Sequence, residues 1–169
     1  MNPKTPENSK TIQTDIVLPG DTNSLNNLFG GELLARMDKV ASIAAIKHSE
    51  QIVVTASINN VAFGEPVPNG SILTIEAKVS RAFNTSMEVF IDVWKQNKTH
   101  KKKTKVNEAI YTFVAVTKSG ETIKVPPLIP ETELEKKRFD AALRRRQLSL
   151  VLAGKMKANE ATELKAIFD

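Results

Sequence analysis

The 169-residue sequence contains no cysteine. Disulfides, thiolate nucleophiles and thiolate metal ligands are therefore excluded together, and the composition fits a reducing, cytoplasmic location. Histidine occurs only at His48, near the end of a helical pattern, and at His100, in a lysine-rich stretch. Neither placement favours a histidine metal cluster or a Ser-His-Asp triad, so we expect no metal site.

Long apolar runs are missing as well. No stretch reaches the roughly 18 apolar residues that cross a bilayer, and the polar N-terminus lacks the apolar segment of a signal peptide. The motifs GxSxG, GxGxxG and HExxH and the Walker phosphate loop are also absent. These gaps exclude several common enzyme classes and predict no membrane partner.

The composition that is present, 41% apolar and 25% charged residues, is typical of a globular domain. The net charge of +5 is spread along the chain, except for a dense lysine cluster over residues 95–105. This cluster has no aromatic residue on which a base could stack. The favoured interpretation is a solvated hairpin tip, followed by a site for a phosphate-rich ligand. Nucleic acid ranks third, and we expect no nucleic-acid partner.

Hydrophobic patterning divides the chain into five strands and one long helix. Strands are predicted over residues 11–18, 51–63, 71–83, 86–96 and 105–117, and the helix over residues 32–48. The last four strands follow one another through short connections, which favours an antiparallel sheet over βαβ units. The expected fold is α+β, with a curved sheet covering the helix. Its free edges and partly apolar second face predict dimerisation.

The flanking segments differ in character from this central part. Residues 1–10 are polar and expected to be flexible, and residues 11–128 form the predicted domain. Residues 129–169 are a charged, helix-favouring extension that follows a proline-rich segment. We expect its three consecutive arginines, residues 144–146, to lie on a solvated face, with contact to phosphate or an acidic partner as the alternative.

Three ordinary features lie close together ahead of the sheet. Gly30 and Gly31 at the helix start leave backbone amides open to a ligand, where the helix dipole favours negative charge. Asp38 lies on the rim of the apolar helix face, and Asn23 lies in the preceding turn. Each has a purely structural explanation when taken alone, and only their combination suggests acyl chemistry with an oxyanion site.

The combination resembles the hotdog-fold acyl-CoA thioesterases, a group that includes bacterial acyl-CoA hydrolases and related cytosolic animal enzymes. The motifs that carry the resemblance are LPGDTN at residues 18–23, FGGELL at 29–34 and the pair Met37-Asp38. The similarity continues through VVTA at 53–56, VAF at 61–63, NTSMEV at 84–89 and AIYTFVAV at 109–116. It covers roughly residues 11–128.

The resemblance implies hydrolysis of fatty acyl-CoA to free CoA and the carboxylic acid, at sites between two protomers. It implies that Asp38 is the general base toward water, or a nucleophile through a mixed anhydride. Asn23 of the facing protomer would position the water or the thioester, and the amides of Gly30 and Gly31 would polarise the carbonyl. The implied assembly is a homo-oligomer with a dimer as the minimal unit, usually a hexamer built as a trimer of dimers. No cofactor is implied beyond CoA itself, which is part of substrate and product.

The resemblance extends to substrate binding. Thr85 and Ser86 match positions that line the CoA channel. Because CoA carries several phosphate groups, a basic cluster near the channel would raise affinity, and Lys101, Lys102 and Lys103 are the candidates. This sequence departs from the family pattern at two places, which bear on loop shape and acyl preference. Residues 24–27 lack a glycine that is frequent in this loop, and Gly70-Ser71 replaces a common Gly-Asp pair.

Three alternatives remain open at this point. The first is a hotdog protein that binds acyl-CoA without hydrolysing it, as a regulator, although the presence of both Asn23 and Asp38 argues against it. The second is a basic nucleic-acid-binding module. The third is a hotdog dehydratase, which usually relies on a histidine in a position that this sequence does not offer.

Overall fold

The computed structural model describes residues 1–97, 99 and 102–168. A short helix α1 (Pro6–Ser9) and strand β1 (Thr11–Ile16) precede the long helix α2 (Gly30–Ser49). Four strands follow: β2 (Ile52–Phe63), β3 (Ile72–Ala82), β4 (Ser86–Gln96) and β5 (Thr104–Val116). The chain ends in helices α3 (Glu133–Leu152) and α4 (Thr162–Lys165).

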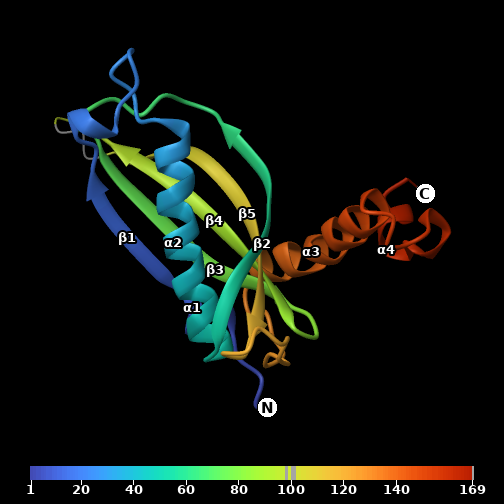
Figure 1. The fold of residues 1–169 in the computed structure, drawn as a ribbon. Coiled ribbons are helices and arrows are strands. Elements are labelled where there is room, and N and C mark those ends of the chain that lie inside the picture. Colours follow the sequence, from blue (N-terminus) through green and yellow to red (C-terminus); the bar gives the residue numbers. More distant parts are fainter. Residues whose placement is uncertain (98, 100–101, 169) are drawn as a thin grey trace.

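The five strands form one antiparallel sheet in the order β1-β3-β4-β5-β2. The sheet curves around α2, which lies along its concave face (Figure 1). This arrangement confirms the α+β fold expected from the sequence. Because β1 and β2 occupy the two ends of the order, each leaves one edge unpaired within this chain.

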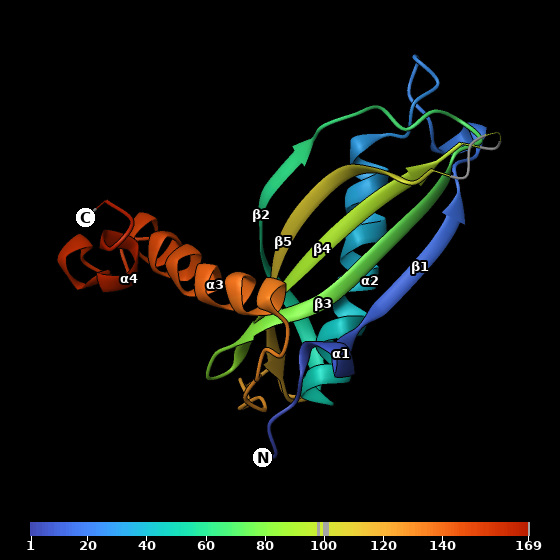
Figure 2. The same ribbon diagram turned by 180° about the vertical axis from the view of Figure 1, so that it is seen from behind.

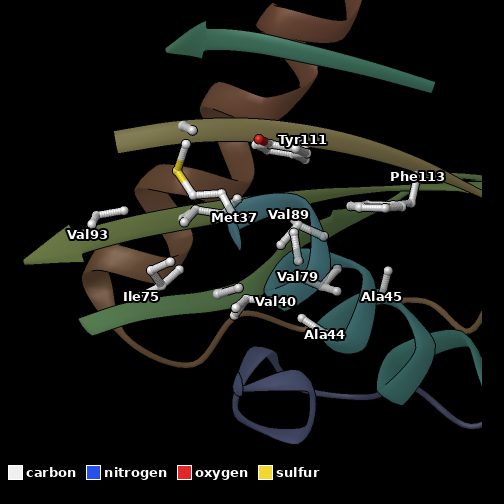
Figure 3. Close-up of a cluster of buried hydrophobic side chains, with 14 of the residues drawn as sticks. Met37, Val40, Ala44, Ala45, Ile75, Val79, Val89, Val93, Tyr111 and Phe113 are labelled. Atoms are coloured by element: carbon white, nitrogen blue, oxygen red, sulfur yellow. The ribbon is translucent and has the colours of Figure 1, made fainter. Parts of the chain in front are cut away.

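The core lies between α2 and the concave face of the sheet (Figure 3). The apolar positions of α2 recur at helical spacing, so they share one face and enter the core together. Fully buried residues of α2 and the sheet include Met37, Val40, Ala44, Val79, Val89, Tyr111 and Phe113. Small residues such as Ala41, Ala44 and Ala45 let the helix approach the strands closely.

The N-terminal segment differs from the expectation of a flexible end. The hydroxyl of Ser9 is fully buried, donates to the Pro6 carbonyl at 2.7 Å and accepts the Val79 backbone N–H at 2.9 Å. The Lys4 backbone N–H donates to the Pro127 carbonyl at 2.9 Å. These long-range partners fix residues 4–10 against β3 and the proline-rich segment, so the prediction was wrong for this part of the chain.

The convex face of the sheet carries α3, which crosses it and then projects outward to end beside α4 (Figure 2). The predicted helical extension therefore exists, and part of it packs on the domain. On this face Phe90 is covered by the Arg138 guanidinium, which lies 3.7 Å from the ring centroid. No helix in the described part of the chain has the length and apolar character needed to cross a membrane.

Candidate active site

The loop before α2 is organised around the Asn23 side chain. Its Oδ1 atom accepts the backbone N–H groups of Leu25 at 2.9 Å and Asn27 at 3.2 Å. The Asn23 backbone N–H in turn donates to the Asn27 carbonyl at 2.8 Å. The side-chain oxygen is thus committed to the turn, and within the described residues the Nδ2 group has no hydrogen-bond acceptor. Asn23 therefore presents an N–H donor in a fixed orientation.

Arg36 of α2 ties this loop to the helix. Its guanidinium lies 2.8 Å from the Asp21 carboxylate, 3.2 Å from that of Asp15 and 3.0 Å from that of Glu32. Burial lowers the pKa of Arg36, but Glu32 and Asp21 outweigh it and hold the pKa above its ordinary value. The Leu18 backbone N–H and Arg36 keep the pKa of Asp21 below its ordinary value.

Arg36 lies on the side of α2 away from the apolar face, yet it is only 9% exposed. The fold brings its carboxylate partners Asp15 and Asp21 from the preceding strand and loop. The side chain is therefore enclosed by charges rather than by apolar groups.

The N-terminus of α2 offers free backbone amides. Phe29 occupies the N-cap position without a side-chain hydrogen bond to the first turn, so the first amides keep their donors for another partner. A side chain at Gly30 would meet the Phe63 ring at 3.3 Å, whereas one at Gly31 would meet nothing within 4 Å. Contact with Phe63 explains why residue 30 is a glycine, whereas no contact explains the glycine at residue 31. The space beside Gly31 leaves the approach to the amides open.

A groove of about 250 Å³ joins the two features. Asn23, Gly30, Leu33 and Phe63 all contribute to its lining. Asn23 and Gly30 therefore line the same groove within one chain.

Asp38 lies elsewhere on α2, facing β2. Its Oδ1 atom accepts the Thr55 hydroxyl at 2.8 Å, which leaves Oδ2 free of protein donors among the described residues. The buried Tyr111 ring is close by: desolvation raises the pKa of Tyr111 to about 12, and the negative charge of Asp38 contributes. The Tyr111 hydroxyl donates to the Leu34 carbonyl at 3.1 Å. Asp38 thus has one oriented oxygen and one available oxygen.

Asp38 and Asn23 do not meet within one chain. Asp38 is two turns into the helix, about 12 Å along its axis from Gly30 at 1.5 Å per residue, and it does not line the groove that contains Asn23. Thr55, the partner of the half-buried Asp38, is exposed and lies on β2, the strand at one end of the sheet.

The remaining predicted site residues are dispersed. Ser86 is buried and accepts the Arg146 guanidinium at 3.2 Å, while Thr85 contributes its carbonyl to the Ala115 N–H. Lys102 and Lys103 are exposed, and Lys101 lies outside the described residues. Lys95 and Lys105, at the ends of the cluster, form ion pairs with Glu65 and with Asp92.

Thr55 is the site residue that sequence reasoning missed. It lies within a motif that supports the resemblance, but a threonine in a Val- and Thr-rich strand is ordinary. A bulge between Thr55 and Ser57 interrupts the alternation of β2, so the pattern does not show which residues face α2. The available signals were its place in this motif and its position on the first strand after the helix.

Comparisons with known proteins identify the family of this chain. A family model described as the thioesterase superfamily matches residues 25–101. An uncharacterized acyl-CoA thioester hydrolase of Bacillus subtilis is 36% identical over 137 residues, which are 81% of this chain and 80% of the relative. A hexameric acyl-CoA thioesterase solved in the apo state superposes with a TM-score of 0.87 at 39% identity, covering 90% of this chain and 98% of the other.

An acyl-CoA hydrolase of Staphylococcus aureus, solved with butyryl-CoA and CoA, superposes with a TM-score of 0.82 at 34% identity. The match covers 96% of this chain and 98% of the other. Variants of that hydrolase in which an asparagine, an aspartate or a threonine is replaced by alanine have also been solved.

The sheet wrapped around α2 is thus the hotdog fold of thioesterases. The chain belongs to the acyl-CoA thioester hydrolase family within the thioesterase superfamily.

Proposed function

We propose that this protein hydrolyses acyl-CoA to CoA and a carboxylic acid, with Asp38 as the catalytic carboxylate. The observation that carries the proposal is the pairing of Asp38 with Thr55 beside the buried Tyr111. The hydroxyl of Thr55 fixes one carboxylate oxygen and leaves the other to accept a proton from water. A correctly oriented base and water provide the advantage of an intramolecular reaction.

The reaction needs a base, an electrophilic carbonyl and a leaving thiolate. Asp38 removes a proton from water while the water oxygen attacks the thioester carbon. The amides at the start of α2 stabilise the resulting oxyanion, each by about 3 kcal/mol by the measured effect of such donors. Collapse of the tetrahedral intermediate releases the CoA thiolate, which takes up the proton. The Nδ2 group of Asn23 donates to the water or the carbonyl.

We further propose that each site combines two protomers, which makes a dimer the minimal active unit. The groove of Asn23 and Gly30 lies about two helical turns from Asp38, so one chain presents the two halves separately. The free edge of β2 beside Thr55 is available for pairing with a second copy. A hexameric assembly is supported by the similarity to the hexameric thioesterase described above.

The Staphylococcus aureus hydrolase supports the choice of residues. The asparagine, aspartate and threonine replaced in its variants are separated by the same intervals along the chain as Asn23, Asp38 and Thr55. The sequence alone suggested the first two of these residues. Thr55 is added by the hydrogen bond in the present structure.

The decisive experiment measures thiol release over a series of acyl-CoA chain lengths for the wild type, Asp38→Asn and Asn23→Ala. We expect kcat to fall about 1000-fold or more for Asp38→Asn, because general acid–base catalysis and water positioning are lost together. Normal turnover by Asp38→Asn would refute the assignment. Hydrolysis of no acyl-CoA by the wild type would favour the regulator that only binds acyl-CoA.

The shared site has its own test. Asp38→Asn and Asn23→Ala protomers are each impaired, but a mixed dimer holds one site with both residues intact. Random mixing should restore about a quarter of the wild-type activity. Sites built within single chains would give no recovery on mixing.

We propose that hydrolysis needs no cofactor besides the CoA carried by the substrate, since a carboxylate, water and amide donors suffice for an activated thioester. A cytoplasmic location also stays a prediction, supported by the absence of cysteine. Activity that survives extensive treatment with chelator would support hydrolysis without a cofactor. Loss of activity that a metal ion restores would contradict it.

A further inference from the structure

The buried tyrosine of β5 meets α2 at the turn that carries Asp38. Tyr111 is fully buried in the core (Figure 3), and its hydroxyl donates to the Leu34 carbonyl at 3.1 Å. Within an α-helix, a carbonyl accepts the backbone N–H of the residue four positions further along. The helical partner of the Leu34 carbonyl is therefore the N–H of Asp38, and Tyr111 donates to the same oxygen as the Asp38 backbone.

This second donor ties the helix turn to the sheet. A carbonyl oxygen has two lone pairs, so the Leu34 carbonyl accepts the Tyr111 hydroxyl without giving up its helical hydrogen bond. A carbonyl with only its helical partner is held by the helix alone. Here the same oxygen is also held from β5, so the hydrogen bond fixes the height and rotation of the turn relative to the sheet.

The strand that provides this anchor is itself firmly held. β5 is hydrogen-bonded on both sides, to β4 and to β2, and Tyr111 pairs with Val89 and Ile58 of these neighbours. The Tyr111 ring lies nearly parallel to that of Phe113, at 14° between planes and 6.3 Å between centroids. A close-packed ring on an interior strand gives the hydroxyl a fixed position.

The side chain of Asp38 has a different support. The Thr55 hydroxyl donates to its Oδ1 atom at 2.8 Å, from an exposed position on the end strand β2. Thr55 sets the rotation of the carboxylate, whereas Tyr111 acts on the backbone beneath it. The two contacts hold Asp38 from two neighbouring strands, and neither replaces the other.

We propose that Tyr111 is a positioning residue for hydrolysis, because it anchors the turn from Leu34 to Asp38 and so places the free Oδ2 atom of Asp38 against the attacking water. The inference rests on the proposed function. Tyr111 itself does not touch the substrate, since the side chain is fully buried and its hydroxyl is engaged with Leu34. Burial raises the pKa of Tyr111 to about 12, and the charge of Asp38 adds to this effect. The hydroxyl therefore stays protonated and remains a donor at neutral pH.

The first test measures kcat and KM for Tyr111→Phe, which removes only the hydroxyl. We expect kcat to fall about 10-fold while KM changes less than about twofold, since the carboxylate is displaced but the substrate still binds. The factor should be the same from about pH 5 to pH 9, because Tyr111 does not titrate in this range. A changed shape of the pH profile would mean that Tyr111 exchanges a proton, and would overturn the positioning role.

Ser49→Ala is the matched control on the same helix. The Ser49 hydroxyl is also buried and also donates to a carbonyl of α2, that of Ala45 at 2.8 Å, but it lies three turns beyond Asp38. Its loss should change kcat less than about twofold. An equal fall of kcat in Ser49→Ala and Tyr111→Phe would show a general loosening of α2 and contradict the proposal.

Two tyrosine analogues at position 111 separate the hydrogen bond from packing. The analogue p-aminophenylalanine keeps a donor at the end of the ring, whereas p-methylphenylalanine fills the space without one. We expect the amino analogue to recover most of the wild-type kcat and the methyl analogue to behave like Tyr111→Phe. Equal kcat values for the two analogues would mean that volume rather than the hydrogen bond matters, which would overturn the inference.

Hydrogen exchange measured by mass spectrometry tests the anchor without any turnover. The peptide that contains Asp38 should exchange about fivefold faster in Tyr111→Phe, the factor for one typical neutral hydrogen bond, while the last turn of α2 stays unchanged. If the wild type hydrolyses no acyl-CoA, this faster exchange still supports the anchor, and the failure belongs to the proposed function. Unchanged exchange around Asp38 would overturn the inference even if kcat falls.

Discussion

The two faces of the sheet hold their helices by different physical means. On the concave face, α2 packs through fully buried apolar side chains such as Met37 and Val40. On the convex face, α3 is attached through Arg138 and Arg145, each paired with a carboxylate that is less than 10% exposed. Apolar packing depends on volume and shape, whereas ion pairs depend on partners and salt.

This difference fits the role proposed for α2. Asp38 and the backbone amide of Gly30 must be held within a fraction of an ångström for catalysis, and a close-packed helix supplies that rigidity. The following predictions test this contrast, beginning with the largest expected effect.

Met37→Ala should be the most damaging change in the concave core. The side chain is fully buried against the sheet (Figure 3), and replacing a buried methionine by alanine typically costs about 2–5 kcal/mol of unfolding free energy. Urea unfolding of the purified variant measures the loss. Leu152→Ala, at a residue 79% exposed, is the control and should change stability by less than about 0.5 kcal/mol. Similar losses for both variants would contradict the contrast.

Glu88→Gln should loosen α3 without disturbing α2. The change leaves Arg145 facing an amide, and we expect a cost of about 2 kcal/mol, below the 3–5 kcal/mol of a fully buried pair because Arg145 is 29% exposed. Hydrogen exchange measured by mass spectrometry should show faster exchange in α3 and unchanged exchange in α2. Faster exchange in both helices would mean that the two faces are not independent.

Arg36 is the exception on the concave side, because an ion cluster there fixes the Asn23 loop. Arg36→Lys keeps the charge but cannot contact Asp15, Asp21 and Glu32 at once. We expect about 1 kcal/mol of lost stability and a several-fold lower kcat, since Asn23 is held less firmly. At low temperature, where loop motion is reduced, the kcat of the variant should come closer to that of the wild type while KM stays unchanged. This result would support a positioning role for Arg36. A variant with normal kcat would show that the loop is fixed without Arg36.

The contrast also explains what the sequence was able to predict. The apolar face of α2 repeats at helical spacing, so Met37, Val40 and Ala44 were placed correctly from local pattern. The burial of Arg36 could not be predicted because its partners Asp15 and Asp21 come from other segments. Thr55 was missed because its relation to Asp38 depends on how β2 turns back along the helix.

The convex face was less predictable because its contacts also join segments that are distant in the sequence. The charge of the C-terminal extension favoured a solvated helix, and the helix itself was predicted. Its attachment relies on Glu88 and Asp92, which read as ordinary outward residues of an alternating strand. Which arginine pairs with which carboxylate follows only from the packed structure.

The smallest effect concerns His48 at the end of α2. Its Nε2–H donates to the Pro126 carbonyl at 2.8 Å, and the buried Nδ1 atom has no partner among the residues that the structure describes. Burial lowers the pKa of His48 below its ordinary value, the Pro126 carbonyl partly opposes this, and Lys4 lowers it further. The unfolded chain therefore binds a proton more readily than the folded one, so the stabilisation is complete above about pH 6.5 and declines as the pH falls toward the folded-state pKa.

The slope from this single group cannot exceed about 1.4 kcal/mol per pH unit. Unfolding free energies measured between about pH 5 and pH 8 for the wild type and His48→Gln provide the check. Glutamine can still donate to the Pro126 carbonyl but does not titrate, so its curve should be flatter on the acidic side. Parallel curves would show that His48, at the junction of α2 with the proline-rich segment, contributes no pH dependence to the stability.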